Sequence, residues 1–224
     1  MPEPYEALKP HLHPSPEEYM EHSSKSPGQM GYLRILNGAA LPFPVHISLD
    51  HRPFAAGVRP FTATGYGCGD PGKRNLRILD GSDPSVLVLE EHVEIPRGGF
   101  VTAVLADSSR SGIRLFCLAD LDCRLMAGEQ SCIRVFNGAM EGEALSLAQW
   151  NGRILWQQVP FGGASSYCSI PPGPHSFYAL SDSSRSPLSS LSLNLQPGYA
   201  YTLYLAGNTW TAGGLRILPA IDGR

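Results

Sequence analysis

The chain has 224 residues, of which 42% are hydrophobic and 17% are charged, a balance that suits a packed core and argues against a disordered chain. The formal net charge is −3 and no cluster of lysine and arginine occurs, so we expect no binding to nucleic acid or to an anionic membrane. No stretch approaches about 18 uninterrupted apolar residues, and we therefore expect no membrane span.

The first 30 residues are predicted to form a mostly extended, proline-rich N-terminal arm. Residues 15–18 read Ser-Pro-Glu-Glu, a pattern typical of a helix start, which indicates a short helix over about residues 16–22. We expect His11 and His13 to be exposed in this arm rather than to hold a metal. The segment has no basic start followed by an apolar run, so it does not resemble a secretory signal.

An internal repeat divides the rest of the chain. The sequence LRILNGA at 33–39 recurs as IRVFNGA at 133–139, and six further short matches follow in nearly the same register. A period this long is that of a domain repeat, because each unit is large enough to bury its own core. We therefore predict two domains, at residues 31–120 and 131–223, joined by a short linker.

Each unit is predicted to be β-structure throughout. Residues 190–195 alternate between polar residues and leucine, which places three leucines on one face of a strand. Asn151-Gly152 lies between two β-rich runs and predicts a two-residue hairpin turn. About seven or eight strands per unit follow, a number that suits an immunoglobulin-like sandwich. The predicted fold class is therefore all-β, with two tandem immunoglobulin-like β-sandwich domains after the extended arm.

Several of these segments resemble the motifs of one family. The segments at 33–39 and 133–139 are similar to an opening strand of the type R-V/I-x-N/H-A, and YCSIPPG at 167–173 resembles a Y-x-x-V-P-P-G turn. Residues 195–207 resemble a closing L-x-P-G-x-x-Y-T-x-x-x-x-G pair. In these motifs the chain resembles the bacterial DUF4397 family of uncharacterised domains over about residues 31–223. The resemblance implies a β-sandwich, usually in an envelope or exterior setting, and brings no catalytic residues.

Few patterns in the sequence are typical of catalysis or metal binding. Residues 67–73 have the G-x-x-x-x-G-K spacing of a phosphate-binding loop, but Arg74 stands in place of the required Ser or Thr and no helical pattern follows, so we expect a turn. We expect His46 to be solvated and Asp50-His51 to form a hairpin turn. The five cysteines lack zinc-site spacing and are expected to be reduced, mostly buried thiols. We predict no catalytic residue, no metal site and no cofactor.

Aromatic residues are the better candidates for a binding site. Trp150 flanks the predicted hairpin turn, and neither Trp150 nor Trp210 recurs in the other unit. An exposed tryptophan on a rigid sandwich suits flat apolar contact with a sugar ring or a protein. Packing of each indole across its own sheet is the alternative. Trp150 and Trp210 are therefore the predicted ligand-binding residues.

These observations favour a non-enzymatic structural or interaction module, and the family resemblance suggests the bacterial cell surface or the spore envelope. The alternative is a carbohydrate- or other ligand-binding protein that uses the exposed aromatics. A third hypothesis, a hydrolase, would require converging carboxylates or a Ser–His pair. The predicted partner is a protein or a glycan. An exposed edge strand could also pair with another copy of the chain and cause self-association.

Overall fold

The computed structural model describes residues 29–109, 112–121, 129–140, 144–210 and 213–223. These residues form seventeen strands, and no α-helix occurs among them. The all-β prediction is confirmed. The short helix predicted over about residues 16–22, together with the rest of the arm, lies outside the described residues.

The first half of the chain forms two sheets, ordered β4-β1-β8-β9, with β5 also on β1, and β3-β2-β6-β7. The strands are β1 (Gly31–Asn37), β2 (Val45–Leu49), β3 (Arg52–Val58), β4 (Thr62–Ala63), β5 (Gly67–Gly69), β6 (Gly72–Asp80), β7 (Leu87–Ile95), β8 (Phe100–Ser108) and β9 (Gly112–Asp120). Their shared core lies between the two sheets and is built from residues such as Leu33, Ile47 and Ile78.

The second half repeats this strand order, with sheets β13-β10-β16-β17 and β12-β11-β14-β15. The strands are β10 (Ser131–Ala139), β11 (Leu145–Gln149), β12 (Ile154–Val159), β13 (Cys168–Ile170), β14 (Gly173–Ser181), β15 (Pro187–Leu195), β16 (Ala200–Gly207) and β17 (Leu215–Asp222). In place of β4 there is a single bridge between Phe136 and Ala164. The four sheets form two sandwich-like units, whereas the immunoglobulin-like class and the boundaries 31–120 and 131–223 stay predictions.

Local sequence explains several of these elements. Asn151 and Gly152 form the β11–β12 turn, where Gly152 has a φ of 79° and the Asn151 side chain accepts a hydrogen bond from the backbone of Arg153. Asp50 and His51 form the equivalent β2–β3 turn with φ values of 48° and 63°. Both hairpin predictions are therefore confirmed. His46, expected in solvent, is half-buried and accepts a hydrogen bond from the backbone of Gly57.

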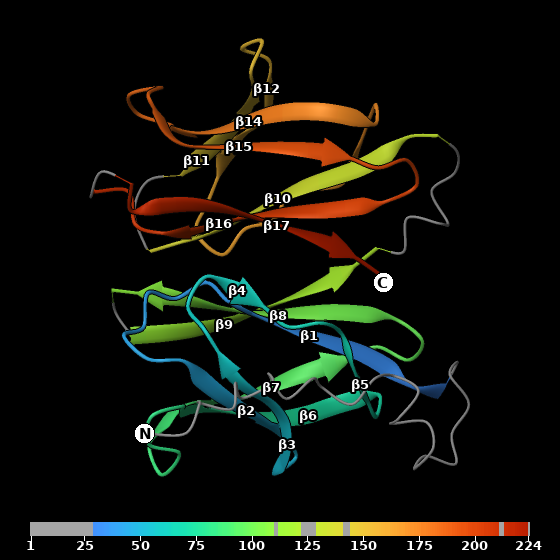
Figure 1. Ribbon diagram of the computed structural model, residues 1–224, viewed down its shortest axis with the longest axis vertical. Coiled ribbons are helices and arrows are strands. Elements are labelled where there is room, and N and C mark those ends of the chain that lie inside the picture. The colour runs from blue at the N-terminus through green and yellow to red at the C-terminus, as the bar shows by residue number, and fades with distance from the viewer. Residues whose placement is uncertain (1–28, 110–111, 122–128, 141–143, 211–212, 224) are drawn as a thin grey trace, which may run out of the picture.

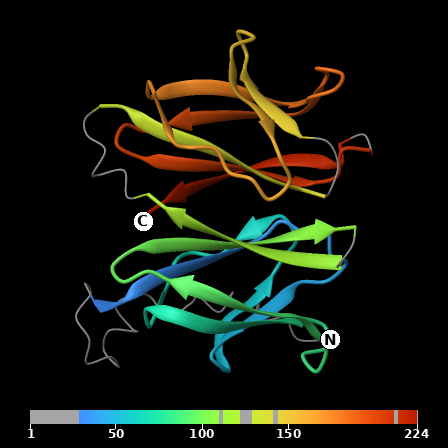
Figure 2. The ribbon, with the colours of Figure 1, turned by 180° about the vertical axis from the view of Figure 1, so that it is seen from behind.

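The two sandwich-like units are stacked through one sheet each, so that the molecule has four layers (Figure 1). Figure 2 shows the same order of layers from behind. The middle layers are the sheets that contain β1 and β10, where β1 runs parallel to β8 and β10 runs parallel to β16. Because they are covered on both faces, β8 and β16 are almost entirely buried.

A small apolar cluster fills the space between the two middle layers. Its buried members come from both units: Leu36, Val104, Leu118, Phe136 and Tyr204. Gly162 also approaches the first unit, because a side-chain carbon at this position would lie only 2.3 Å from the ring of Phe116. The units are thus in direct apolar contact.

Two reciprocal ion pairs flank this cluster. Arg34 of the first unit contacts Asp222 of the second at 2.7 Å, and Arg134 of the second contacts Asp120 of the first. Each arginine also donates from Nε to a threonine of its own sheet, Thr102 in the first case. All four charged side chains are 7% exposed or less. Each unit thus pairs its arginine with the aspartate of the other unit, as the two halves of a two-fold symmetric interface do.

Two tyrosines complete the network on each side. Tyr66 donates to Asp120 at 2.7 Å, and Tyr167 donates to Asp222 at 2.8 Å. The guanidinium of Arg34 lies 4.6 Å from the ring centre of Tyr66. Burial raises the pKa of both phenols well above its ordinary value. In Tyr66 the positive charge of Arg34 opposes this effect but does not cancel it. The tyrosines therefore stay neutral and keep donating to the two carboxylates.

Candidate functional site

The most exposed large apolar side chain belongs to a turn held by hydrogen bonds. Trp150 follows β11 and is 73% exposed. Its backbone N–H donates to the carbonyl of Ser176 at 3.0 Å, and Gln149 donates to the carbonyl of Arg153 at 2.8 Å across the turn. The β11–β12 hairpin projects beyond the outer sheet in both views (Figure 1, Figure 2). The indole is therefore presented to solvent on an ordered backbone.

Two surface depressions flank Trp150 on the outer sheet of the second unit. The first has a volume of about 520 Å³ and a lining of mixed polarity, and we call it the polar depression after its polar side chains, His175, Ser176, Ser192 and Asn194. The second has a volume of about 510 Å³ and a mostly apolar lining that includes Ala148, Ile154, Tyr178, Leu180 and Pro187, together with the polar Gln149 and Arg185. We call Trp150 together with these two depressions the Trp150 face.

Hydrogen bonds fix the side chains of the polar depression. Ser176 and Ser192 share a hydrogen bond of 3.0 Å between their hydroxyls, which joins β14 to β15. The Gln149 amide nitrogen lies 3.2 Å from Nδ1 of His175, whose Nε2 lies 2.8 Å from the carbonyl of Pro171. Because an amide nitrogen can only donate and a carbonyl oxygen can only accept, this arrangement has Nδ1 of His175 as an acceptor and Nε2 as a donor. Both of its nitrogens are therefore engaged by the protein.

The two tryptophans predicted as ligand-binding residues are both exposed but do not share a depression. Trp210 lies between β16 and β17, is 60% exposed, and does not line either side of the Trp150 face. The third tryptophan, Trp156, packs against the core of the second unit. The roles of Trp150 and Trp210 in binding stay predictions.

The sequence analysis missed the side chains that surround Trp150. Ser176 and Tyr178 alternate along β14, and Ser192 and Asn194 alternate along β15, so all four lie on the outer face of one sheet. The alternation in β15 was visible in the sequence, but it indicated only which leucines faced the core. Pairing with β14, which brings Ser176 opposite Ser192, is what places the two strands beside Trp150.

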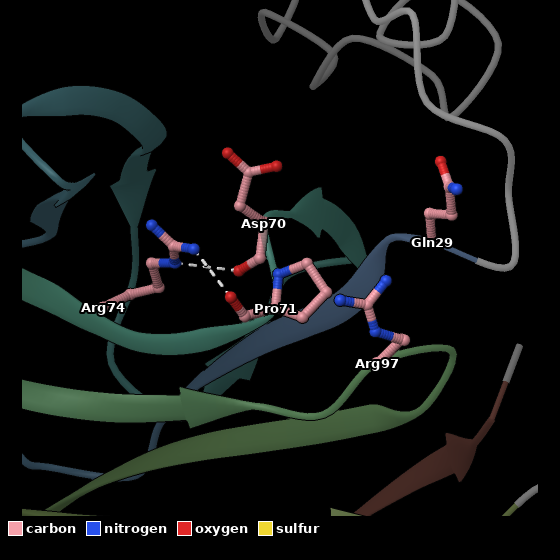
Figure 3. Close-up of a pocket in the computed structure, with 5 residues that line it drawn as sticks. All are labelled: Gln29, Asp70, Pro71, Arg74 and Arg97. Atoms are coloured by element: carbon pink, nitrogen blue, oxygen red, sulfur yellow. Dashed lines mark hydrogen bonds between the residues drawn. The ribbon is translucent and has the colours of Figure 1, made fainter.

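The segment with phosphate-loop spacing forms a different surface depression, of about 370 Å³, in the first unit (Figure 3). β5 and β6 are joined here by a turn, as predicted, and no helix follows. Arg74 donates to the backbone carbonyls of Asp70 and Pro71 at 2.9 and 2.6 Å, and to the carboxylate of Asp50 at 3.3 Å. Arg74 thus braces the turn, while Arg97 lies on the opposite wall (Figure 3).

Other side chains that could bind a metal or react are dispersed. Among the described residues, no group of three or more His, Cys, Asp or Glu side chains is placed to hold a metal ion. In the same part of the chain, no helix is long and apolar enough to cross a membrane. Four cysteines are described and all are free thiols: Cys68 and Cys132 are buried, Cys168 is half-buried and Cys117 is exposed. Cys123 lies outside the described residues.

Comparison with known proteins gives a family. Residues 31–148, more than half of the chain, match the domain of unknown function DUF4397. The chain belongs to the DUF4397 family. The matched residues run from β1 to β11, so the hairpin turn of this DUF4397 protein and its strands β14 and β15 lie beyond them.

Two solved structures are similar to this DUF4397 protein at low levels. The Bacillus anthracis TIE protein is 9% identical with a TM-score of 0.26, and the match covers 81% of this chain but 34% of that one, so the chain spans about a third of its length. A structure described as alpha-glucan recognition by family 41 carbohydrate-binding modules from streptococcal virulence factors is 11% identical, with a TM-score of 0.24 and coverage of 78% and 93%. No curated protein matches the chain. At these TM-scores neither likeness carries an argument about this protein.

Proposed function

We propose that this DUF4397 protein is a non-enzymatic interaction module that binds its partner through the Trp150 face. The observation that carries the proposal is an indole that is 73% exposed on a hydrogen-bonded turn, between two depressions. Tryptophan is enriched among the residues that dominate the binding energy of interfaces, because it provides a large rigid contact area and loses little conformational entropy on binding. By contrast, Phe116, Phe136 and Tyr204 pack against one another, and Trp156 packs against the core of the second unit.

The geometry of the Trp150 face supports binding rather than hydrolysis. A serine nucleophile needs a histidine nitrogen that can accept its proton. His175 is next to Ser176 in the polar depression, but its Nδ1 accepts from Gln149 and its Nε2 donates to Pro171. Ser176 is bonded to Ser192 instead. The polar groups at this face are therefore arranged to support one another and to offer their remaining hydrogen-bonding capacity to a ligand.

The lining favours an uncharged ligand with both apolar and hydroxyl surfaces. A pyranose ring has C–H faces that stack on an indole and hydroxyls that exchange hydrogen bonds with serine and asparagine. The Trp150 face places Ser176, Ser192 and Asn194 on one side of Trp150 and the apolar Ile154 and Leu180 on the other. A neutral glycan is therefore our first candidate ligand. A protein partner at the bacterial cell surface or in the spore envelope is the second, supported by the family resemblance.

Affinity electrophoresis in gels that contain neutral polysaccharides tests this proposal. Fragments of any polysaccharide that retards the protein are then used in titration calorimetry to measure the affinity. We expect Trp150→Ala to weaken binding by roughly 30-fold or more, the effect of losing one dominant anchor. Trp210→Ala is the matched control, since Trp210 is similarly exposed but outside the face, and we expect it to bind like the unaltered protein. Retardation that survives Trp150→Ala would remove the Trp150 face from consideration. If only Trp210→Ala abolished binding, the site would lie on the β16–β17 connection.

A further inference from the structure

Strand β15 (Pro187–Leu195) is a long edge strand. It pairs with β14 along its whole length and ends the outer sheet of the second unit. Among the described residues, no strand pairs with its other side. An edge of this kind presents unpaired N–H and C=O groups that can accept a further strand.

The equivalent edge of the first unit is protected, whereas β15 is not. β7 occupies the same place in its sheet and carries Glu90, Glu91 and Glu94. Glu91 falls on the same side of the strand as the core residue Val93, and an inward-directed charge is a common device against strand addition. β15 has no charged residue, and its only proline is at its first position. The two equivalent edges therefore differ: the β7 edge is guarded by charged side chains, whereas the β15 edge has none and is open to pairing.

The sequence of β15 is complementary to itself in antiparallel pairing. With Ser192 on a two-fold axis, Leu191 of one copy lies opposite Leu193 of the other, and this happens twice. Both leucines pack against the core of their own unit, so the apolar layer would continue from one copy into the next. On the exposed face, Ser190 lies opposite Asn194 of the second copy, and these uncharged side chains can exchange hydrogen bonds.

The same pairing is unfavourable for β7. With His92 on the axis, Glu90 lies opposite Glu94 of the second copy, again twice, and like charges in direct opposition are destabilising. Glu91 would at the same time be placed against Val93, the position that Leu191 and Leu193 fill in β15. The charges on β7 therefore disfavour pairing at that edge, whereas the uncharged β15 edge can pair with a second copy.

From this contrast, we propose that β15 pairs with β15 of a second copy of the chain and forms a two-fold dimer. The two outer sheets then become one continuous antiparallel sheet. Because the equivalent β7 edge is guarded, this pairing cannot be repeated there, which favours a closed two-fold dimer over extension through both units. This inference does not depend on the function of the Trp150 face.

The test is sedimentation equilibrium of the intact chain from low to high micromolar concentration. We expect a reversible monomer–dimer equilibrium, and we expect Ser190→Glu combined with Asn194→Glu to be monomeric throughout, since each new carboxylate would face another across the axis. Both side chains are exposed, so the thermal midpoint should not change at low concentration, where the unaltered chain is also monomeric. A chain that is monomeric at every concentration, or a dimer that persists in the double variant, would overturn the proposal.

The reverse exchange on β7 provides a second, independent measurement. Glu90→Ser and Glu94→Asn combined with Glu91→Leu give β7 the residues that β15 has at the three equivalent positions. If charge is what closes this edge, the variant should form species larger than a dimer, because each chain then has two pairing edges. A variant that remains a simple dimer would contradict the charge argument.

Discussion

At the scale of single residues, Arg34 is the side chain whose loss should cost most. It bonds to Asp222 at 2.7 Å and to the carbonyl of Ile221 at 2.6 Å, both in the other unit, while its own side chain is 5% exposed. Arg34→Met would leave Asp222 buried without its closest cation. We expect the free energy of unfolding to fall by about 3–5 kcal/mol, the usual penalty for breaking a buried pair by removing one partner.

Urea denaturation followed by tryptophan fluorescence measures this effect. Arg59→Met is the control, because Arg59 is exposed, and we expect it to change stability by less than about 0.5 kcal/mol. Arg134→Met should behave like Arg34→Met, since Arg134 makes the equivalent bonds to Asp120 and to the carbonyl of Ala119. Equal stability of Arg34→Met and Arg59→Met would mean that the ion pairs do not hold the units together.

Cys117 should react with alkylating agents in an unusual pH range. Although the residue as a whole is exposed, partial burial of its thiol, and after it the negative charge of Glu91, raises the pKa to about 11. Only the thiolate reacts. The alkylation rate at Cys117, followed by peptide mass spectrometry, should therefore continue to rise up to about pH 11, whereas an ordinary thiol levels off above about pH 9.

The sign of the accompanying stability change follows from proton binding. Because the folded state holds the Cys117 proton more tightly than the unfolded state, unfolding releases it between the ordinary pKa and about 11. Stability therefore declines as pH rises through that window. Glu91→Gln removes one of the two causes and should lower the pH at which alkylation levels off. A rate that levels off near pH 9 in the unaltered protein would contradict the raised pKa.

Sequence reasoning singled out the two exposed tryptophans but missed the role of the two buried arginines. It named Trp150 and Trp210 as candidate binding residues and left open whether each ring packs across its own sheet, and both prove to be exposed. It also aligned Arg34 with Arg134 in the repeated motif, but it did not indicate that either arginine is buried. Strand periodicity reports only which residues share a face, whereas the partner of Arg34 lies 188 positions away in the other unit.

At the scale of elements, the end of β16 depends on a glycine. Gly207 has a φ of 95°, and a side-chain carbon there would lie 2.0 Å from the carbonyl oxygen of Gly214. Gly207→Ala combines backbone strain with a backbone clash, and we expect a loss of about 1–3 kcal/mol or more in thermal unfolding. Gly65→Ala is the control, because no atom lies within 4 Å of its added carbon. Equal midpoints for the two variants would show that the β16–β17 connection can adjust.

Short-range elements were predictable and long-range pairing was not. The Asn151-Gly152 turn and the alternation in β15 depend on neighbours in sequence, and both are present. The parallel pairing of β1 with β8 joins Tyr32 to Phe100, and no local pattern specifies it. Nor does periodicity predict that β8 and β16 are buried on both faces, because that burial comes from the other unit.

At the scale of the whole molecule, the proposed dimer and the Trp150 face are adjacent. Ser192 and Asn194 lie on β15 and also line the polar depression beside Trp150. Pairing through β15 would therefore bring two Trp150 faces onto one continuous sheet. A ligand with repeating units could then occupy both faces at once, which raises apparent affinity without any new contact at either site.

The stacking of the two units leads to a last prediction about the intact chain. The apolar cluster around Phe136 and Tyr204 and the two reciprocal ion pairs join the units through residues other than the connecting residues 122–128. If a protease site is inserted into that segment and cut, the two halves should therefore stay together and elute as one species from a size-exclusion column.

The matched control is the same cleavage in a chain that also carries Arg34→Met and Arg134→Met. Without its two arginines the interface retains two buried carboxylates, Asp120 and Asp222, which have lost their cations and face each other across it. We expect the cleaved halves of this variant to separate on dilution, while those of the unaltered sequence remain paired. Separation of both would show that the covalent connection, rather than the two-fold arrangement of charges, holds the four layers together.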